Sequence, residues 1–171
     1  YARRILGLEA LKAIDAPPGA SERGTAIHKA IELFEDRRDA TLLTSLLEQE
    51  LHRAGFPPER LAAERERLSV SVIAFMEWLE SRRGVSVYRE KKGTLALAGG
   101  VTLSGTADRI EIDAVGVGAI LDFKTGAPPT ASQVASGLSP QLPLEAAMMA
   151  RGAFEGVPAA HVADLIYWRI G

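Results

Sequence analysis

The sequence predicts an α/β fold in which helices flank a mixed, mainly antiparallel central sheet. Two observations predict it: apolar residues recur at helical spacing through residues 1–83, and from residue 84 onward they alternate with polar residues. A length of 171 residues, with 47% hydrophobic and 25% charged, is ordinary for one globular core. We therefore expect a single domain over residues 1–171, with a helical part at 1–83 and an α/β catalytic core at 84–171.

Helical periodicity divides the first part of the chain into separate segments. Helices are expected at residues 1–12, from 21 to about 34, at 40–53 and at 59–82. The prolines and glycine at 17–19 end the first helix, because proline lacks an amide donor and restricts the residue before it. Ser21 is the expected N-cap of the second helix, whose apolar stripe consists of Ile27, Ile31 and Phe34.

Alternating segments separated by glycine turns predict strands in the second part. These segments are residues 85–90, 94–98, 101–113 and 119–124. Ser139 and Pro140 have the chemistry of a helix start, with serine as the cap and proline in the first turn of a helix that runs toward Ala153. A last strand is expected at about 160–169, and it completes the sheet.

Composition also restricts the functional class. With 20 Lys and Arg residues against 22 Asp and Glu, the net charge is −2, so the chain has no general attraction for a polyanion. The absence of cysteine means that this segment alone holds no disulfide, thiolate zinc site or iron–sulfur cluster. No stretch reaches the ~20 apolar residues that cross a bilayer. We expect a cytoplasmic fragment of a longer protein, with no membrane partner.

Two acids and a lysine stand on core-facing positions of neighbouring strands. Alternation places Asp108 on the same face as Ile110, and it places Asp122 and Lys124 together on one face of the next strand. An ion pair between Asp122 and Lys124, or a strand end open to water, would be enough to explain those two residues. Asp108 adds a second carboxylate, and two carboxylates that repel each other favour a divalent cation. Two acids, an amine and an open coordination position are what metal-assisted phosphodiester hydrolysis requires.

A histidine on the helix that starts at Ser21 is a further candidate. His28 lies about 100° from Ile27, at the edge of the apolar stripe, where a side chain can face a cleft. Gly24, one turn earlier, leaves space there for an ion or a phosphate. The alternative is an ordinary half-buried histidine, and His52 and His161 are expected to be structural.

Four short segments, in their order along the chain, carry a family resemblance. They are Gly24-Thr-Ala-Ile-His28, Gly105-Thr-Ala-Asp108-Arg-Ile, Leu121-Asp122-Phe-Lys124-Thr-Gly and Gln141-Leu-Pro-Leu-Glu145. This order resembles the RecB-like nuclease domains of the PD-(D/E)XK superfamily, with the C-terminal nuclease domain of AddB as the nearest likeness. The resemblance covers nearly the whole chain, including residues 1–6, and it implies a restriction-endonuclease-like fold.

The resemblance implies a role for each matching residue. The ligands of Mg²⁺ or Mn²⁺ would be His28, Asp108, Asp122 and the backbone carbonyl of Phe123. Lys124 would be the catalytic lysine, and Gln141 would position DNA or that lysine. Glu90 would match the acid of the first core strand, although a solvated edge charge explains it equally well. Glu145 stands where the family motif has tyrosine, which removes an aromatic contact and can add negative charge near DNA.

The implied function is that of an exonuclease that processes double-strand breaks in a helicase-nuclease complex, with DNA and an AddA-like subunit as partners. Many relatives carry an iron–sulfur cluster held by cysteines, and this segment has none. A competing possibility is a catalytically inactive nuclease-like scaffold or DNA-holding module. A phosphoesterase for small substrates is disfavoured, because no glycine-rich nucleotide loop is present.

Overall fold

The computed structural model describes residues 17–171, so the helix expected at 1–12 lies outside the described residues. The elements in chain order are α2 (Ala20–Phe34), α3 (Ala40–Arg53), α4 (Pro58–Ser81), β1 (Ser86–Ala96), η1 (Ala98–Gly100), β2 (Thr102–Ile112), β3 (Val117–Lys124), α5 (Ala131–Ala135), α6 (Gln141–Met149) and β4 (His161–Arg169). The strands form a sheet in the order β1-β2-β3-β4. Neighbours from β1 to β3 are antiparallel, and β4 runs parallel to β3. The predicted mixed α/β fold with a helical N-terminal half is confirmed.

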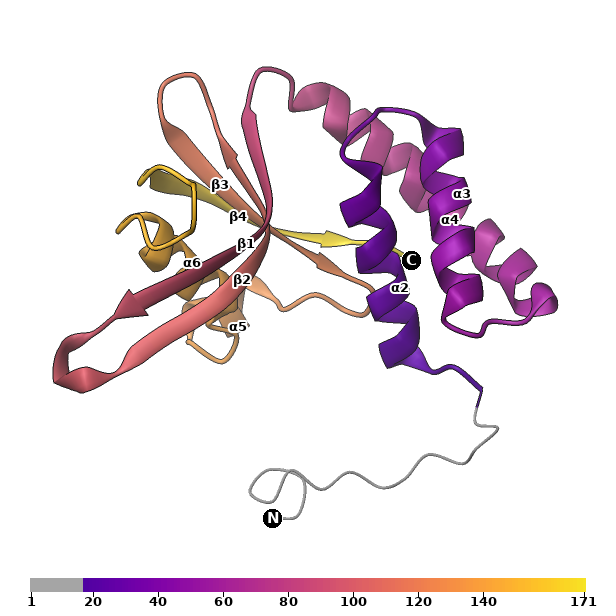
Figure 1. Cartoon of the computed structure of the whole chain (residues 1–171), viewed down its shortest axis with the longest axis horizontal. Helices are drawn as coiled ribbons and strands as arrows, with labels where there is room; N and C mark the ends of the chain where they lie inside the picture. The colour runs from indigo at the N-terminus through magenta and orange to yellow at the C-terminus, as the bar shows by residue number, and fades with distance from the viewer. Residues whose placement is uncertain (1–16) are drawn as a thin grey trace, which may run out of the picture.

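Helices cover both faces of the sheet, and each face has its own apolar core. Figure 1 shows α2, α3 and α4 gathered on one side of the sheet, and α6 on the other. The first core joins those three helices to Phe123 of β3, and it includes the predicted stripe of Ile27, Ile31 and Phe34. The second core packs Met148 and other residues of α6 against the sheet. The end of β3 therefore lies between two packed layers, with helices above and below it.

Two predicted helix caps are wrong. The N-cap of α2 is Gly19 and not Ser21, because the helix begins directly after the prolines and Glu22 accepts a hydrogen bond from the Gly19 amide at 3.0 Å. The N-cap of α6 is Pro140 and not Ser139, whose backbone amide donates to the Gln133 carbonyl at 3.1 Å. Neither serine hydroxyl caps a helix, because the Glu22 carboxylate does so at α2 and Pro140 provides no side-chain cap at α6.

The two strands expected at 85–90 and 94–98 are one strand, β1, and Gly93 between them is not a turn. Gly93 pairs with Gly105 of β2. A Cβ atom at Gly93 would lie 2.6 Å from both Met148 Cε and Phe154 Cδ1, so glycine allows the strand to approach the second core closely. The turn instead uses Gly99 and Gly100, whose φ angles are 79° and 77°. The resulting β1–β2 hairpin projects beyond the rest of the sheet (Figure 1).

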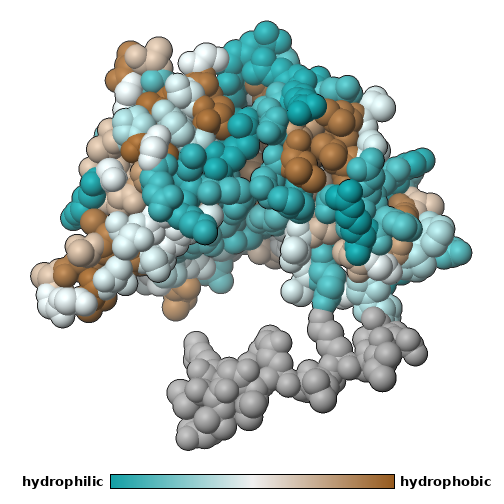
Figure 2. All heavy atoms as spheres, in the orientation of Figure 1, coloured by the Kyte–Doolittle hydropathy of each residue, from teal (hydrophilic) through white to brown (hydrophobic). Residues whose placement is uncertain are grey.

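The described helices and the visible surface bear on the membrane question. None of the helices in residues 17–171 is both long and apolar enough to cross a bilayer. Figure 2 shows polar residues over much of the face seen in Figure 1, with the apolar residues in separate patches. This face therefore carries no continuous apolar surface.

Candidate active site

The first acid lies where strands β2 and β3 stop pairing. Their ladder runs from Ile112 opposite Gly118 to Arg109 opposite Leu121, and the same register puts Asp108 opposite Asp122 just beyond it. There the Asp108 carboxylate accepts a hydrogen bond from the Phe123 backbone amide at 2.9 Å. The side chain therefore takes the place of a ladder bond, and its second oxygen remains available to a ligand.

Polar residues also occupy the neighbouring positions on β1 and β4, so they form a row across the sheet. On β1, Glu90 stands opposite Asp108, at a point where the β1–β2 ladder is interrupted and the φ angle of Glu90 is 48°. On β4, Tyr167 is the partner of Asp122. Adjacent strands are about 4.8 Å apart, so the backbone positions of these three acids lie on neighbouring strands. The side chains of β2 do not alternate strictly between the two faces of the sheet at this point. Ala107 and Ile110 are three residues apart, yet both pack in the second core.

Helix α2 brings His28 to the same row. His28 Nδ1 lies 3.5 Å from Asp108 Oδ2, and its ring contacts Phe123 edge-on, with the ring centroids 6.4 Å apart. Gly24, one turn earlier, lies close to the residue that follows β3, since a Cβ there would be 3.3 Å from Thr125 Oγ1. The space expected beside Gly24 is thus bordered by a hydroxyl, while His28 remains next to the carboxylate.

Asp122, Lys124 and Gln141 form a connected group from β3 and α6. Asp122 is 3% exposed, and its Oδ2 lies 2.7 Å from the Lys124 ammonium. The Gln141 amide donates to Asp122 Oδ1 at 2.6 Å, and its oxygen accepts from Lys124 at 3.2 Å. The ion pair considered as an alternative in the sequence is therefore present, and the start of α6 orients both of its members.

Glu145 lies behind this group rather than on the surface. It is 5% exposed, and its Oε1 accepts a hydrogen bond from the Gln141 amide at 3.2 Å. Burial raises the pKa of Glu145 to about 7, and the nearby charge of Asp122 acts in the same direction. The side chain is enclosed, so it presents no charge to a macromolecule at the surface.

The pKa values of Asp108 and Glu90, on β2 and β1, are raised as well. Burial raises the pKa of Asp108 above its usual range, against the opposing effect of the Phe123 amide. Desolvation, followed by repulsion from Asp108 and Glu32, raises the pKa of Glu90. Glu32 lines a pocket together with His28 and Glu90, and the sequence analysis did not name it. Its position four residues after His28 on the same helix was the signal that could have identified it, because residues at that spacing lie on one face. The site therefore accumulates carboxylates that favour a cation.

The donor chemistry fits a hard divalent cation, although the ligands do not converge as they stand. Within residues 17–171, no group of three or more His, Asp or Glu side chains is close enough to hold an ion. Asp122 Oδ2 is buried, and no described residue donates a well-aligned hydrogen bond to it. Carboxylate oxygens beside an imidazole are a ligand set that Mg²⁺ and Mn²⁺ accept. His28, Asp108 and Asp122 are the residues that would hold such an ion, and their side chains would have to move closer together to do so.

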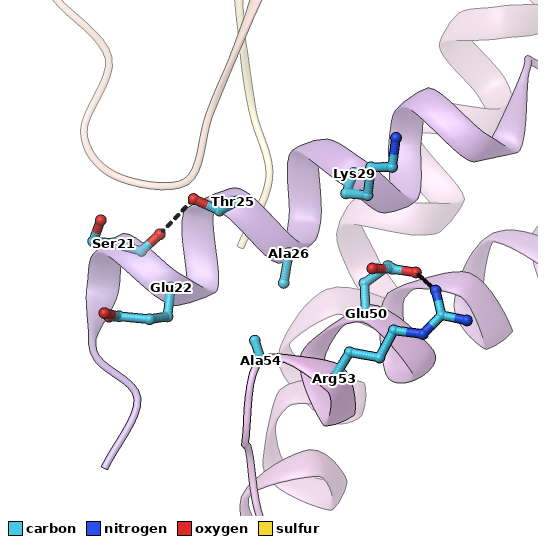
Figure 3. Close-up of a pocket in the computed structure, with 8 residues that line it drawn as sticks. All are labelled: Ser21, Glu22, Thr25, Ala26, Lys29, Glu50, Arg53 and Ala54. Carbon is cyan, nitrogen blue, oxygen red and sulfur yellow. Dashed lines mark hydrogen bonds and ion pairs between the residues drawn. The ribbon is translucent and has the colours of Figure 1, made fainter. Parts of the chain in front are cut away.

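A second groove lies between α2 and the end of α3, and it does not contain the predicted site. Figure 3 shows its lining, from Ser21 and Lys29 of α2 to Arg53 and Ala54. It shares Thr25 and Lys29 with the pocket that holds His28, but none of the predicted metal ligands or catalytic residues lines it. The chemistry-bearing residues are thus concentrated at the sheet.

Comparison with known proteins gives both relatives of this chain and a family. Relatives include uncharacterized proteins of Rickettsia bellii, 33% identical over 169 residues, Rickettsia felis, 33% identical over 170, and Rickettsia conorii, 32% identical over 170. Each alignment covers 90% of this chain and 20% of the relative, so the chain spans about a fifth of the length of the curated relatives that it matches. The model of the PD-(D/E)XK nuclease superfamily matches residues 1–171. Since that match covers the entire chain, the chain belongs to the PD-(D/E)XK nuclease superfamily.

Proposed function

We propose that this chain is a Mg²⁺- or Mn²⁺-dependent deoxyribonuclease that hydrolyses phosphodiester bonds. The observation that carries the proposal is that Asp108 and Asp122 lie on neighbouring strands just beyond the last paired rung of β2 and β3, close enough that, in addition to burial, the charge of Asp122 raises the pKa of Asp108. Lys124 lies 2.7 Å from one of these acids, and His28 lies 3.5 Å from the other. Membership of a nuclease superfamily supports the same chemistry.

Each residue has a separate task in this proposal. His28, Asp108, Asp122 and the Phe123 carbonyl would hold the ion. The bound ion would lower the pKa of a water molecule and offset charge on the scissile phosphate. Lys124 orients the attacking water or stabilises the developing negative charge, and Gln141 holds the Lys124 ammonium in place at 3.2 Å. Glu90 of β1 would add a further carboxylate beside His28 and Asp108.

We also propose the biological setting implied by the resemblance to RecB-like domains and AddB. The chain would act as an exonuclease on double-strand breaks in the cytoplasm, as part of a helicase-nuclease complex with an AddA-like subunit.

A second candidate is an inactive nuclease-like scaffold that holds DNA. It is favoured by one observation, because Lys124 and Gln141 together already partner the two oxygens of Asp122 without a cation. In that case the ion pair would be a structural element. The two candidates differ in whether the site binds a divalent metal.

Metal binding tests the proposal directly. Mn²⁺ titrated into the chain by calorimetry is expected to bind, and Asp108→Asn or Asp122→Asn is expected to weaken binding at least about tenfold, since each change removes a charged oxygen ligand. Asp164→Asn is the matched control, because Asp164 is exposed on β4. Equal Mn²⁺ affinity in all four proteins, or no binding at all, would favour the scaffold.

DNA affinity gives an independent prediction. With a net charge of −2, the isolated chain is expected to bind duplex DNA weakly, because counterion release requires many cationic contacts. Fluorescence anisotropy at about 50 and 200 mM salt measures the affinity and its salt dependence. Tight binding that resists the higher salt would contradict the expectation that most DNA contacts come from elsewhere in an assembly.

A further inference from the structure

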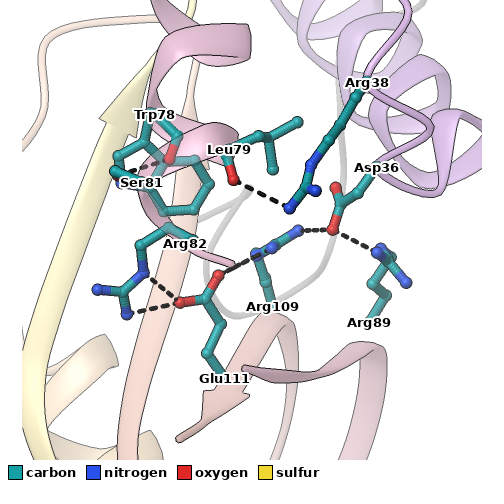
Figure 4. A network of polar contacts seen from close by, with 9 residues as sticks. All are labelled: Asp36, Arg38, Trp78, Leu79, Ser81, Arg82, Arg89, Arg109 and Glu111. Atoms are coloured by element: carbon teal, nitrogen blue, oxygen red, sulfur yellow. Dashed lines mark hydrogen bonds and ion pairs between the residues drawn. The ribbon is translucent and has the colours of Figure 1, made fainter. Parts of the chain in front are cut away.

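A partly buried ionic network joins the end of α2 to the sheet, and none of its members is a proposed metal ligand. Asp36, in the turn after α2, accepts hydrogen bonds from Arg89 of β1 and Arg109 of β2 on the same oxygen, Oδ2. These three residues are called the Asp36 clamp below. Figure 4 shows the two guanidinium groups converging on the Asp36 carboxylate.

Charge makes Asp36 necessary at this point. Arg89 and Arg109 are direct cross-strand partners, and like charges placed opposite each other repel. Arg109 is 3% exposed at its side chain, so water screens this repulsion poorly. Glu111 cannot balance both arginines, because it is shared between Arg109, at 2.8 Å, and Arg82, at 2.7 Å. The carboxylate that offsets the pair comes from the α2 end, so the sheet register and the docking of α2 depend on each other.

The clamp lies immediately beside the proposed metal site. Arg89 precedes Glu90 in β1, and Arg109 follows Asp108 in β2. His28 is six residues before Phe34, the last residue of α2, which is about 9 Å along the helix axis, and Asp36 follows two residues later. A shift of the α2 end along the sheet would therefore change the 3.5 Å separation of His28 Nδ1 and Asp108 Oδ2.

The turn that carries Asp36 is held in an unusual backbone conformation. Glu35, Asp36 and Arg38 have φ angles of 51°, 56° and 54°, in the left-handed region that residues other than glycine rarely adopt. Arg38 also donates a hydrogen bond to the Leu79 carbonyl of α4 at 3.2 Å. Contacts with the sheet and with α4 therefore hold this turn in place against its local preference.

We propose that Asp36 is a positioning residue, which acts through Arg89 and Arg109 to hold α2 where His28 reaches Asp108, and thereby sets the affinity for a divalent cation. This inference rests on the proposed function, since it assumes that His28 and Asp108 bind the ion. A role in folding alone would change stability without coupling Asp36 to His28.

A double-mutant cycle in Mn²⁺ affinity tests the inference. Asp36→Asn is expected to weaken Mn²⁺ binding by roughly 10–100-fold, which is the usual range when a residue that orients a metal ligand is changed. In the His28→Ala background, Asp36→Asn is expected to have almost no further effect. Glu35→Gln is the matched control, because Glu35 is in the same turn but its side chain is 62% exposed. Circular dichroism and melting in EDTA report folding separately.

The outcomes separate this inference from the function on which it rests. Equal losses from Asp36→Asn in both backgrounds, or no loss in either, would overturn the positioning role while leaving the metal site intact. Failure of the unsubstituted chain to bind Mn²⁺ would overturn the proposed function and this inference with it. If Asp36→Asn does not fold, Arg89→Lys decides, because it keeps the positive charge beside the metal site and the pair between Asp36 and Arg109 but removes the guanidinium contact between β1 and Asp36. Arg89→Lys is expected to weaken Mn²⁺ binding only when His28 is present, and unchanged binding would overturn the inference.

Discussion

Lys124→Met is expected to reduce cleavage of linear DNA by about 10²–10³-fold while the chain still binds Mn²⁺. This is the usual effect of removing one group that stabilises charge in a transition state. Lys124 lies 2.7 Å from Asp122, so its ammonium is also a like charge beside any cation that Asp122 binds. Mn²⁺ affinity should therefore stay the same or rise, whereas a metal ligand would show the opposite behaviour.

Single-turnover cleavage at low salt is the appropriate measurement, because the chain is expected to bind DNA weakly. Lys92→Met provides the control, since Lys92 is an exposed lysine of β1 outside the site. Cleavage that is unchanged in Lys124→Met would remove Lys124 from the catalytic mechanism.

The same variant distinguishes the nuclease from the inactive scaffold through its stability. If the ion pair is structural, Lys124→Met leaves the buried Asp122 carboxylate without its counter-charge and should cost about 3–5 kcal/mol, with or without Mn²⁺. The double variant Lys124→Met/Asp122→Asn would then recover much of that loss. If a cation is the main counter-charge, Mn²⁺ itself should restore the stability of Lys124→Met.

The sequence predicted the elements well where local periodicity determines them. The apolar stripe of α2 and the long helix α4 are both where helical spacing put them. The turn predicted at Gly93 is wrong because a local pattern does not show which residues pack against a glycine. Position 93 requires glycine because Met148 and Phe154, which are distant in the chain, pack closely against it. α5 was not predicted at all, since five residues are too few to establish a period.

Candidate site residues could be named from the sequence, but their arrangement could not. Asp108, Asp122 and Lys124 stood out because charges occupied core-facing positions of strands. The row from Glu90 across to Tyr167 depends on strand register, which alternation within one strand does not determine. Asp36 lies in a run of charged residues directly after the apolar stripe of α2, and nothing in that run singles it out. Its role depends on the pairing of Arg89 with Arg109, which only the folded sheet brings about.

Glu145→Gln is expected to make the metal-free chain about 3 kcal/mol more stable than the unsubstituted chain at about pH 8, and to have little effect near pH 4. Burial raises the pKa of Glu145 from its ordinary 4.5 to about 7 in the folded chain. A pKa difference of one unit between the folded and unfolded chain corresponds to about 1.4 kcal/mol of stability, so this rise in pKa corresponds to about 3 kcal/mol.

The direction follows from proton linkage. Below pH 4.5 the Glu145 carboxyl is protonated in both the folded and the unfolded chain, so it carries no penalty. As pH rises toward 7, the unfolded chain releases this proton while the folded chain retains it, and the folded chain loses stability. Glutamine cannot ionise and can still accept the hydrogen bond from Gln141. Urea unfolding in EDTA at several pH values measures the difference, with the exposed Glu155→Gln as control. An identical pH dependence in Glu145→Gln and the unsubstituted chain would mean that Glu145 ionises freely in the folded state, which its 5% exposure argues against.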